Sequence, residues 1–149
     1  MQLKAAVRRN PVTVAPDTTL ATAAKAMDEG GVGALVVVED GQPTGIVTDR
    51  DITVRATARR FPPDARIDSV MSTDLVTRPA DDEISAALHV FDEHPIRRLP
   101  LVDDEGALVG LVSADDLLVN ISSELAELVR PITAQVIFSH PEPDVPAVP

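Results

Sequence analysis

The sequence repeats itself, and this repeat restricts the possible folds more than any other feature. When the chain is shifted by 64 positions, residues 3–40 align without a gap with residues 67–104. One extra residue then enters the second half, the shift becomes 65, and the alignment continues until Asp51 meets Asp116. Self-similarity at a fixed period indicates one supersecondary unit built twice. We therefore expect two copies of the same arrangement of strands and helices.

Each copy is predicted to run β-α-β-β-α. A short strand leads to an amphipathic helix, whose apolar face includes Leu20 and Met27 in the first copy and Ile84 and Phe91 in the second. A short run rich in Val predicts a buried strand, and a turn leads to another strand and a second helix. The predicted strands span residues 12–14, 34–38 and 45–47, and residues 75–77, 99–102 and 108–112. The first helices end at Gly30-Gly31 and His94-Pro95, and the second helices begin near Thr48 and Ser113.

The copies are separated at Pro62-Pro63, because consecutive prolines cannot continue a helix. A long helix is expected from Asp115 to Arg130, stopped by Pro131, while residues 132–138 are compatible with either a strand or a helix end. The Pro-rich tail that follows is expected to be disordered or extended. The expected domains are a first repeat in residues 1–60, a linker in 61–66, a second repeat in 67–130 and a C-terminal extension in 131–149.

The composition excludes several classes of partner. A formal net charge of −11 opposes binding to nucleic acid or an anionic membrane, and the absence of Trp and Tyr argues against base stacking. No apolar run approaches the length of a membrane span. The absence of Cys removes disulfides and thiolate sites and is consistent with a cytoplasmic location. The charge is uneven, with a net of +1 in residues 1–66 and −12 in residues 67–149.

No pattern typical of catalysis or of a metal site is present. The sequence lacks a nucleophile elbow, a phosphate-binding Walker loop, a zinc-protease helix motif and a dinucleotide-binding glycine motif. His89 and His94 are five residues apart, which misses the helical spacing of a metal site, and His140 lies in the tail. We therefore expect a protein that is not an enzyme and has no metal site of its own.

Two segments carry a family resemblance. Residues 45–51 (GIVTDRD) and 110–116 (GLVSADD) resemble the Gly-h-x-Thr/Ser-x-x-Asp signature of CBS domains, where h is apolar, and residues 32–35 and 96–103 resemble the strand entry of that family. The resemblance covers residues 3–125. It implies an α/β (α+β) fold in which two tandem β-α-β-β-α repeats pack as a pseudo-two-fold intramolecular pair, the Bateman module. Many such modules bind adenosyl ligands in two clefts, and many others have no known ligand.

The Thr48–Asp51 and Ser113–Asp116 pairs allow two interpretations. Thr/Ser-x-x-Asp after a strand is a capping box, in which the hydroxyl accepts from a free backbone N–H and the carboxylate is favoured by the helix dipole. The same helix N-terminus suits a phosphate, and a carboxylate one turn in can accept both hydroxyls of a ribose. The resemblance in both repeats favours ribose binding, and the two roles are compatible.

Other candidate residues follow from the resemblance. Arg97 and Arg98 are expected to contact phosphates, although they could also be a solvated pair beside acidic neighbours. The first repeat has Gly33 and Ala34 at these positions, so the two clefts should not be equivalent. Arg50 is a weaker phosphate candidate within a basic stretch of the helix after Thr48, which otherwise reads as a solvated surface and in which Arg55 and Arg59 should share a face. The residues expected near adenine, each of which could instead be plain core, are Val12, Thr13, Val14, Val32, Val76, Thr77 and Ile96.

These expectations combine into one functional hypothesis. The chain is expected to be a stand-alone regulatory sensor that binds an adenine nucleotide of the AMP, ADP or ATP class and signals to an unidentified protein effector. No cofactor is required, any Mg²⁺ should arrive with the nucleotide, and the family implies a homodimer. The alternative is a ligand-free protein-interaction scaffold, in which the Thr/Asp and Ser/Asp pairs are helix caps only.

Overall fold

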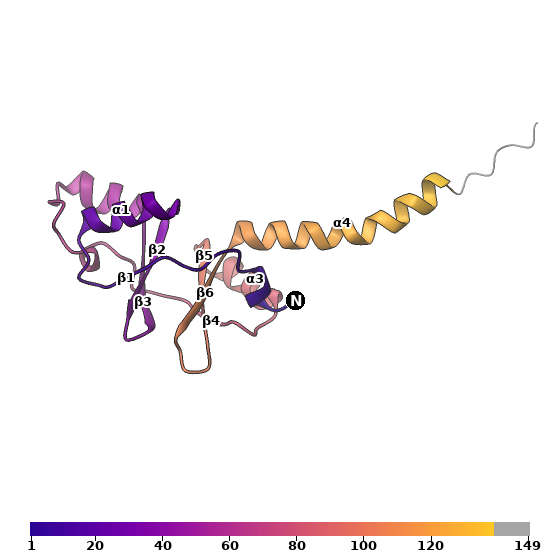
Figure 1. Cartoon of the computed structure of the whole chain (residues 1–149), viewed down its shortest axis with the longest axis horizontal. Helices are drawn as coiled ribbons and strands as arrows, with labels where there is room; N and C mark the ends of the chain where they lie inside the picture. Colours follow the sequence, from indigo (N-terminus) through magenta and orange to yellow (C-terminus); the bar gives the residue numbers. More distant parts are fainter. Residues whose placement is uncertain (139–149) are drawn as a thin grey trace, which may run out of the picture.

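The computed structural model describes the backbone of residues 1–138 and the side chains of residues 1–133, and it contains two small sheets side by side (Figure 1). In each sheet the middle strand pairs parallel with a short first strand and antiparallel with the third. The two-copy β-α-β-β-α prediction is therefore confirmed. The first half contains β1 (Thr13–Val14), α1 (Leu20–Gly30), β2 (Ala34–Glu39) and β3 (Gln42–Thr48). The second contains β4 (Arg78–Pro79), α3 (Ile84–Glu93), β5 (Arg98–Val102), β6 (Leu108–Ser113) and α4 (Ala114–Phe138).

The first helices end where their sequences predict. Thr19 caps α1 by accepting a hydrogen bond from the Thr22 backbone N–H at 3.2 Å. The helix stops at Gly31, whose φ of 59° is a left-handed conformation that glycine adopts without strain. α3 stops at Glu93, followed by His94 in an extended conformation. Leu20 and Met27 on α1, and Ile84 on α3, point into the two cores as their spacing predicts.

The expected strand at residues 75–77 is wrong in position, because the structure forms β4 at Arg78–Pro79. The reason lies in the facing strand. In the first half, the Val36 N–H donates to the Val12 carbonyl at 3.1 Å and starts the parallel pairing. The equivalent of Val36 in the second half is Pro100, which has no N–H to donate to Val76. Pairing therefore begins one residue later, between Arg78 and Leu101.

The helix after Thr48 is less regular than expected. It consists of a single α-turn, α2 (Asp49–Asp51), then a π-helical turn (Ile52–Ala56) and a 3₁₀ turn (Thr57–Arg59). Arg55 lies in the π-helical turn and Arg59 in the 3₁₀ turn, so the α-helical spacing from which a shared face was expected does not apply to them. The segment ends at Arg60, whose φ of 61° reverses the chain.

The expected stop of the last helix at Pro131 is also wrong, because α4 continues to Phe138. Proline removes one intrahelical hydrogen bond and its ring crowds the preceding turn, which bends a helix more often than it ends one when nothing else interferes. The outer part of α4 changes direction accordingly (Figure 1). Residues 132–138, which the sequence left open, are helical, whereas the expected disorder of the tail concerns residues 139–149, outside the described residues.

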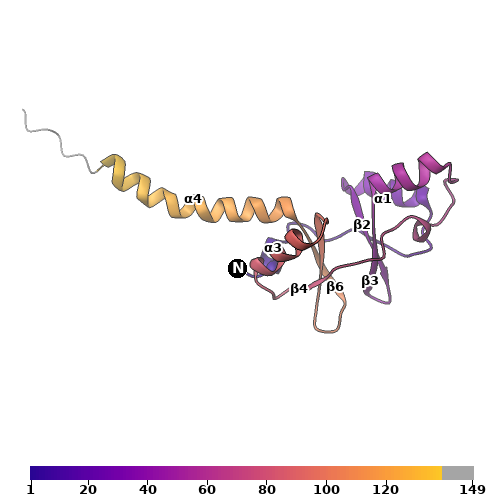
Figure 2. The ribbon, with the colours of Figure 1, turned by 180° about the vertical axis from the view of Figure 1, so that it is seen from behind.

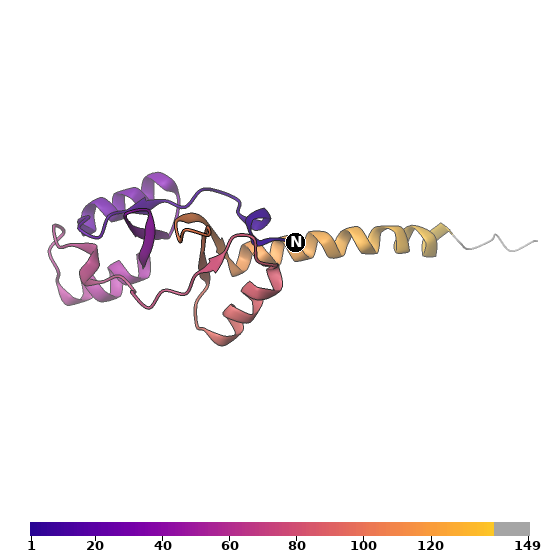
Figure 3. The same cartoon turned by 90° about the horizontal axis from the view of Figure 1, so that it is seen from below.

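The two halves exchange short segments. The 3₁₀ turn η1 (Leu3–Ala6) begins the first repeat, yet Leu3 and Ala6 are buried in the core of the second half with Leu99 and Leu117. In the first half the corresponding place is taken by η4 (Ile67–Ser69), which begins the second repeat. Figures 2 and 3 show η1, at the N-terminus, against the second half beside α3 and the base of α4. Each core is thus completed by the first residues of the other repeat.

The exchange is symmetric down to individual hydrogen bonds. The Leu3 N–H donates to the Asp82 carbonyl and the Ile67 N–H to the Thr18 carbonyl, both at 2.8 Å. These pairs are related by the same shift of 64 positions that relates the two repeats. The symmetry between the two halves therefore includes the exchanged segments, η1 and η4.

Candidate functional site

Both signature pairs form a complete capping box. The Thr48 hydroxyl accepts from the Asp51 N–H at 3.1 Å, while Asp51 Oδ2 accepts from the Thr48 backbone N–H at 2.9 Å. In the second half the Ser113 hydroxyl accepts from the Asp116 N–H at 3.0 Å, and Asp116 Oδ2 accepts from the Ser113 N–H at 3.0 Å. Each hydroxyl also donates to the same carboxylate oxygen. The helix-cap interpretation is therefore correct for both pairs, and it occupies the Oδ2 atom of each aspartate.

The second carboxylate oxygen, Oδ1, faces an arginine in both halves, but the two arginines differ. Asp51 Oδ1 lies 3.6 Å from Nε of Arg55, one turn further along the same helix. Arg55 is anchored there, because it also donates to the Val70 carbonyl at 3.1 Å. Asp116 Oδ1 lies 3.9 Å from Nε of Arg8, which comes from the segment between η1 and β1. This longer contact between an exposed arginine and a half-buried carboxylate is weak, so Asp116 Oδ1 remains available to another partner.

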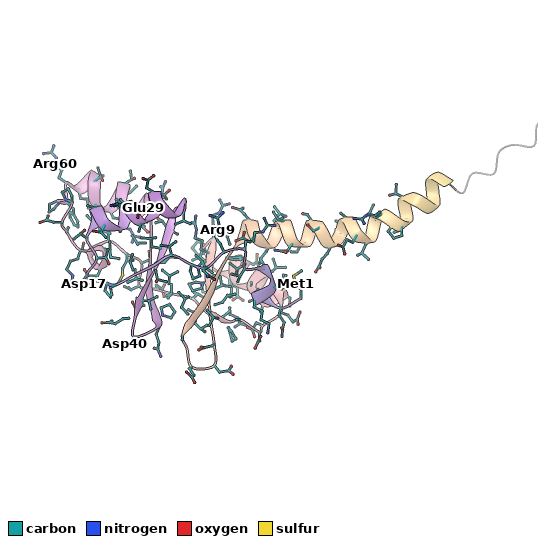
Figure 4. All side chains as sticks on the ribbon, in the orientation of Figure 1. Met1, Arg9, Asp17, Glu29, Asp40 and Arg60 are labelled. Atoms are coloured by element: carbon teal, nitrogen blue, oxygen red, sulfur yellow. The ribbon has the colours of Figure 1, made fainter. Side chains whose placement is uncertain are left out.

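A cavity of about 610 Å³ opens beside Asp116, between the two halves. The second half supplies the start of α4 and the adjoining strands β5 and β6, and the first half supplies the entry to β1 and the segment between α1 and β2. Figure 4 shows Arg9 at this junction, near the base of α4. The lining residues are Arg8, Arg9, Asn10, Pro11, Val12, Gly31, Val32, Gly33, Ala34, Arg97, Arg98, Leu111, Ser113, Asp115 and Asp116.

The cavity is locally basic although the chain carries a net charge of −11. Four guanidinium groups and two carboxylates line it, and the N-terminus of α4 adds positive potential. The Arg97 guanidinium donates one hydrogen bond, from Nη2 to Asp115 Oδ1 at 3.3 Å, and its side chain is 76% exposed. Arg98 is half-buried on β5, opposite Ser113 on β6. An anion entering here meets several positive groups.

The structure brings six of the sequence-predicted site residues to this cavity. They are Val12, Val32, Arg97, Arg98, Ser113 and Asp116. The others lie outside it: Thr48, Asp51 and Arg50 at the start of α2, Thr13 and Val14 in β1, and Val76, Thr77 and Ile96 in the second half. Val14, Val76 and Ile96 also pack against the two cores, as the alternative interpretation of these residues allows.

The related position beside Asp51 differs in its backbone. Ile46 and Ser72 exchange two hydrogen bonds, at 3.0 and 2.9 Å, which hold the chain entering the second half across β3. By the repeat, the corresponding pair is Leu111 and Arg8, and within residues 1–138 no such bridge joins them. The position beside Asp116 is therefore open, whereas the hydrogen bonds between Ile46 and Ser72 hold a chain segment across the position beside Asp51.

Sequence reasoning missed Arg8 and Arg9, which precede the first predicted strand. Their equivalents under the 64-residue shift are Ser72 and Thr73, so the repeat places two guanidinium groups where its second copy has hydroxyls. This difference between aligned positions was the available signal. The difference is informative because the exchange of segments brings the first residues of the first repeat to the second half.

Two features are absent from the described residues, a membrane-spanning helix and a metal site. No helix among them is long and apolar enough to cross a membrane. No group of three or more His, Asp or Glu side chains in that part of the chain is arranged to hold a metal ion. His140 lies outside the described residues.

The CBS domain family matches residues 3–56 and 67–123, and these matches cover both repeats. The chain is a tandem CBS domain protein. The CBS pair is 43% identical to the CBS domain-containing protein YhcV of Bacillus subtilis over 108 residues, which cover 72% of this chain and 76% of the relative. The resemblance inferred from the two signature segments is thereby confirmed.

Solved structures share the fold of this CBS pair. The CBS domain pair of protein MJ0100, in complex with 5′-methylthioadenosine and S-adenosyl-L-methionine, has a TM-score of 0.74 at 23% identity, with 83% of this chain and 98% of the other covered. A CBS domain protein from Pyrobaculum aerophilum, complexed with AMP, has a TM-score of 0.72 at 23% identity, with 83% and 99% covered. The inosine-5′-monophosphate dehydrogenase of Thermoplasma acidophilum is 33% identical, but this chain spans only 21% of that enzyme.

Proposed function

We propose that this CBS pair is a regulatory module that binds an adenine nucleotide of the AMP, ADP or ATP class in the cavity beside Asp116. The observation that carries the proposal is the combination found in that cavity: an available carboxylate oxygen at a helix N-terminus and four guanidinium groups. A ribose needs the first, and phosphates need the second. The adenosyl ligands of the two solved CBS relatives support the same class.

Each group has a defined role in this proposal. Asp116 Oδ1 accepts from the ribose hydroxyls, and Ser113 holds the carboxylate in place through the capping box. Arg8 leaves Asp116 and, with Arg97 and Arg98, turns to the phosphates. Val12 and Val32 supply apolar walls for the base. Four guanidinium groups favour an anionic nucleotide over a cationic sulfonium such as S-adenosylmethionine.

The position beside Thr48 and Asp51 is a second, weaker site in this proposal, with Arg50 near the phosphates. Thr13, Val14, Val76, Thr77 and Ile96 remain candidates for contacts with a base at either position. A ligand fits there only after the hydrogen bonds between Ile46 and Ser72 break and Arg55 leaves the Val70 carbonyl. We therefore expect a single high-affinity site for each chain.

Signalling follows from the position of the cavity. Because its walls come from both halves, a bound nucleotide favours one relative packing of the halves over others. A partner protein that contacts both halves reads this shift. We propose that the module acts in the cytoplasm as a homodimer, without catalysis and without a resident cofactor, and that any Mg²⁺ arrives with the nucleotide.

Isothermal titration with ATP, ADP, AMP, NAD and S-adenosylmethionine tests the proposal. Asp116→Asn keeps one oxygen for the capping box but removes the negative charge, and we expect it to weaken nucleotide binding tenfold or more. Asp51→Asn is the matched control, because it makes the same change in the other capping box. It should lower stability as much as Asp116→Asn and leave the high-affinity site intact.

Two results would count against the sensor. Flat titrations at millimolar nucleotide favour the alternative, in which the repeats are a ligand-free interaction scaffold. If nucleotide binding survives Asp116→Asn but is lost in Asp51→Asn, the high-affinity site lies beside Asp51 instead.

A further inference from the structure

Helix α4 leaves the body of the molecule, and its outer part is exposed as far as the side chains are described. Leu117 is buried against the second core, yet every side chain from Ile121 to Thr133 is exposed. Figures 1 and 3, which view the molecule from perpendicular directions, both show α4 projecting away from the two sheets. Most helical stability in proteins comes from the packing of an apolar face, and the exposed side chains of the projecting part lack such packing in the single chain.

The exposed residues of α4 form an apolar seam with a regular period. Its five members are Leu118, Ile121, Leu125, Leu128 and Ile132, with exposed fractions of 64%, 36%, 59%, 68% and 60%. Their spacing alternates between three and four residues, which is the a/d pattern of a left-handed coiled coil. Such a seam is filled by the side chains of a second helix with the same period.

The residues that flank the seam allow a second copy of the chain to be that partner. Heptad positions e and g face the partner helix at the edges of the seam. Position e holds Ser122 and Val129, and position g holds Glu124 and Pro131. In a parallel pair Glu124 faces Val129 of the other copy, so the like-charge repulsion that prevents self-pairing is missing. Glu127 and Arg130 lie on the side turned to solvent. An anionic membrane is a poorer partner, because this helix carries more carboxylates than cations.

We propose that the seam on α4 pairs with the same seam of a second copy to form a two-helix coiled coil. This deepens the homodimer of the proposed function but does not depend on nucleotide binding. The seam covers about two heptads, so we expect a weak dimer with a dissociation constant on the order of micromolar. Helix content in α4 should rise as the dimer forms.

Sedimentation equilibrium from low to several hundred micromolar protein tests the seam. The double variant Leu125→Glu/Leu128→Glu should weaken dimerisation at least tenfold. Both side chains are exposed in the single chain, so the variant should fold and bind nucleotide normally. Val119→Ser is the matched control, since Val119 is an exposed apolar residue of the same helix outside the seam. The wild type sedimenting as a monomer throughout, or an unchanged dimer in the double variant, overturns the proposal.

A crosslinking experiment gives an independent readout. Because the chain has no Cys, Leu125→Cys introduces a single thiol inside the seam. A short bis-maleimide should link two such chains, and Ser123→Cys on the solvent side should crosslink much less. Equal crosslinking of the two variants would contradict the seam. The variant Asp116→Asn should crosslink in the Leu125→Cys background as the parent does, which separates this inference from the nucleotide site.

Discussion

A single aspartate can serve as a helix cap and a ligand site because its two oxygens are used separately. In both capping boxes Oδ2 holds the helix start, and Oδ1 is left to an arginine. The arginine that faces Oδ1 differs between the two sites. Arg55 is fixed by the Val70 carbonyl, whereas Arg8 holds Asp116 at 3.9 Å. Whether the carboxylate is available to a ligand therefore depends on Arg8 or Arg55, which lie outside the signature segments.

Truncating the two arginines should separate these roles. Arg8→Ala should weaken ATP binding more than AMP binding, because Arg8 is expected to turn to the phosphates, and it should change stability little. Arg55→Ala should lower the free energy of unfolding by about 1 kcal/mol through the lost hydrogen bond to Val70. Urea denaturation and nucleotide titration on both variants check this. Equal effects of the two variants on binding would contradict the assignment of Arg8.

At the scale of the elements, the signature glycines have a packing role. A Cβ at Gly45 would lie 2.8 Å from Met71 Sδ and 3.0 Å from the Ser72 carbonyl oxygen. A Cβ at Gly110 would lie 2.9 Å from Cγ2 of Val7. Both glycines sit where the segment that enters the opposite half crosses a strand. Each signature therefore begins with glycine, because the crossing segment leaves no room for a Cβ: its backbone and Met71 fill the space at Gly45, and the Val7 side chain fills it at Gly110.

Alanine at these glycines should be costly for that reason. We expect Gly45→Ala and Gly110→Ala each to lower the free energy of unfolding by about 1–3 kcal/mol, as overpacking does. Val109→Ala, at an exposed neighbouring position, should change it by less than about 0.5 kcal/mol. Urea denaturation measures all three. A change at Gly45 as small as that at Val109 would show that the crossing segment can move aside.

The elements also show which features a sequence can predict. Hydrophobic period, Gly31 and the two signature segments are local, so the helices, inner strands and capping boxes follow from them. The start of β4 depends on Pro100 in a facing strand, and the length of α4 depends on the lack of neighbours around Pro131. Arg8 reaches the cavity only because a distant segment is exchanged. The missed features are therefore those set by residues far away in the chain.

At the scale of the whole molecule, the exchanged segments make the stability of each half depend on the other. Leu3 and Ile67 are both 0% exposed, each in the core of the half that its own repeat does not form. Truncation of either should cost about 2–5 kcal/mol, the usual range for a buried Leu or Ile replaced by Ala. The location of the damage is the stronger test.

Hydrogen exchange can locate it. Leu3→Ala should speed amide exchange first in β5, β6 and α3, and Ile67→Ala should do so first in β2, β3 and α1. Mass spectrometry of peptic fragments resolves these regions. If Leu3→Ala loosened α1 and β2 before the second half, the exchange of segments would not describe the protein in solution.

The exchange also sets an order of events during synthesis on the ribosome. The first repeat cannot complete its core until Ile67 and Val70 have emerged, and Leu3 must wait for Leu117, near the start of α4. Leu3 is thus synthesised more than a hundred residues before the partner that completes its packing. Pulse-labelling of stalled nascent chains should detect no protected first repeat before the η4 segment is exposed. Tandem duplication has here produced a protein in which neither copy completes its core from its own residues alone.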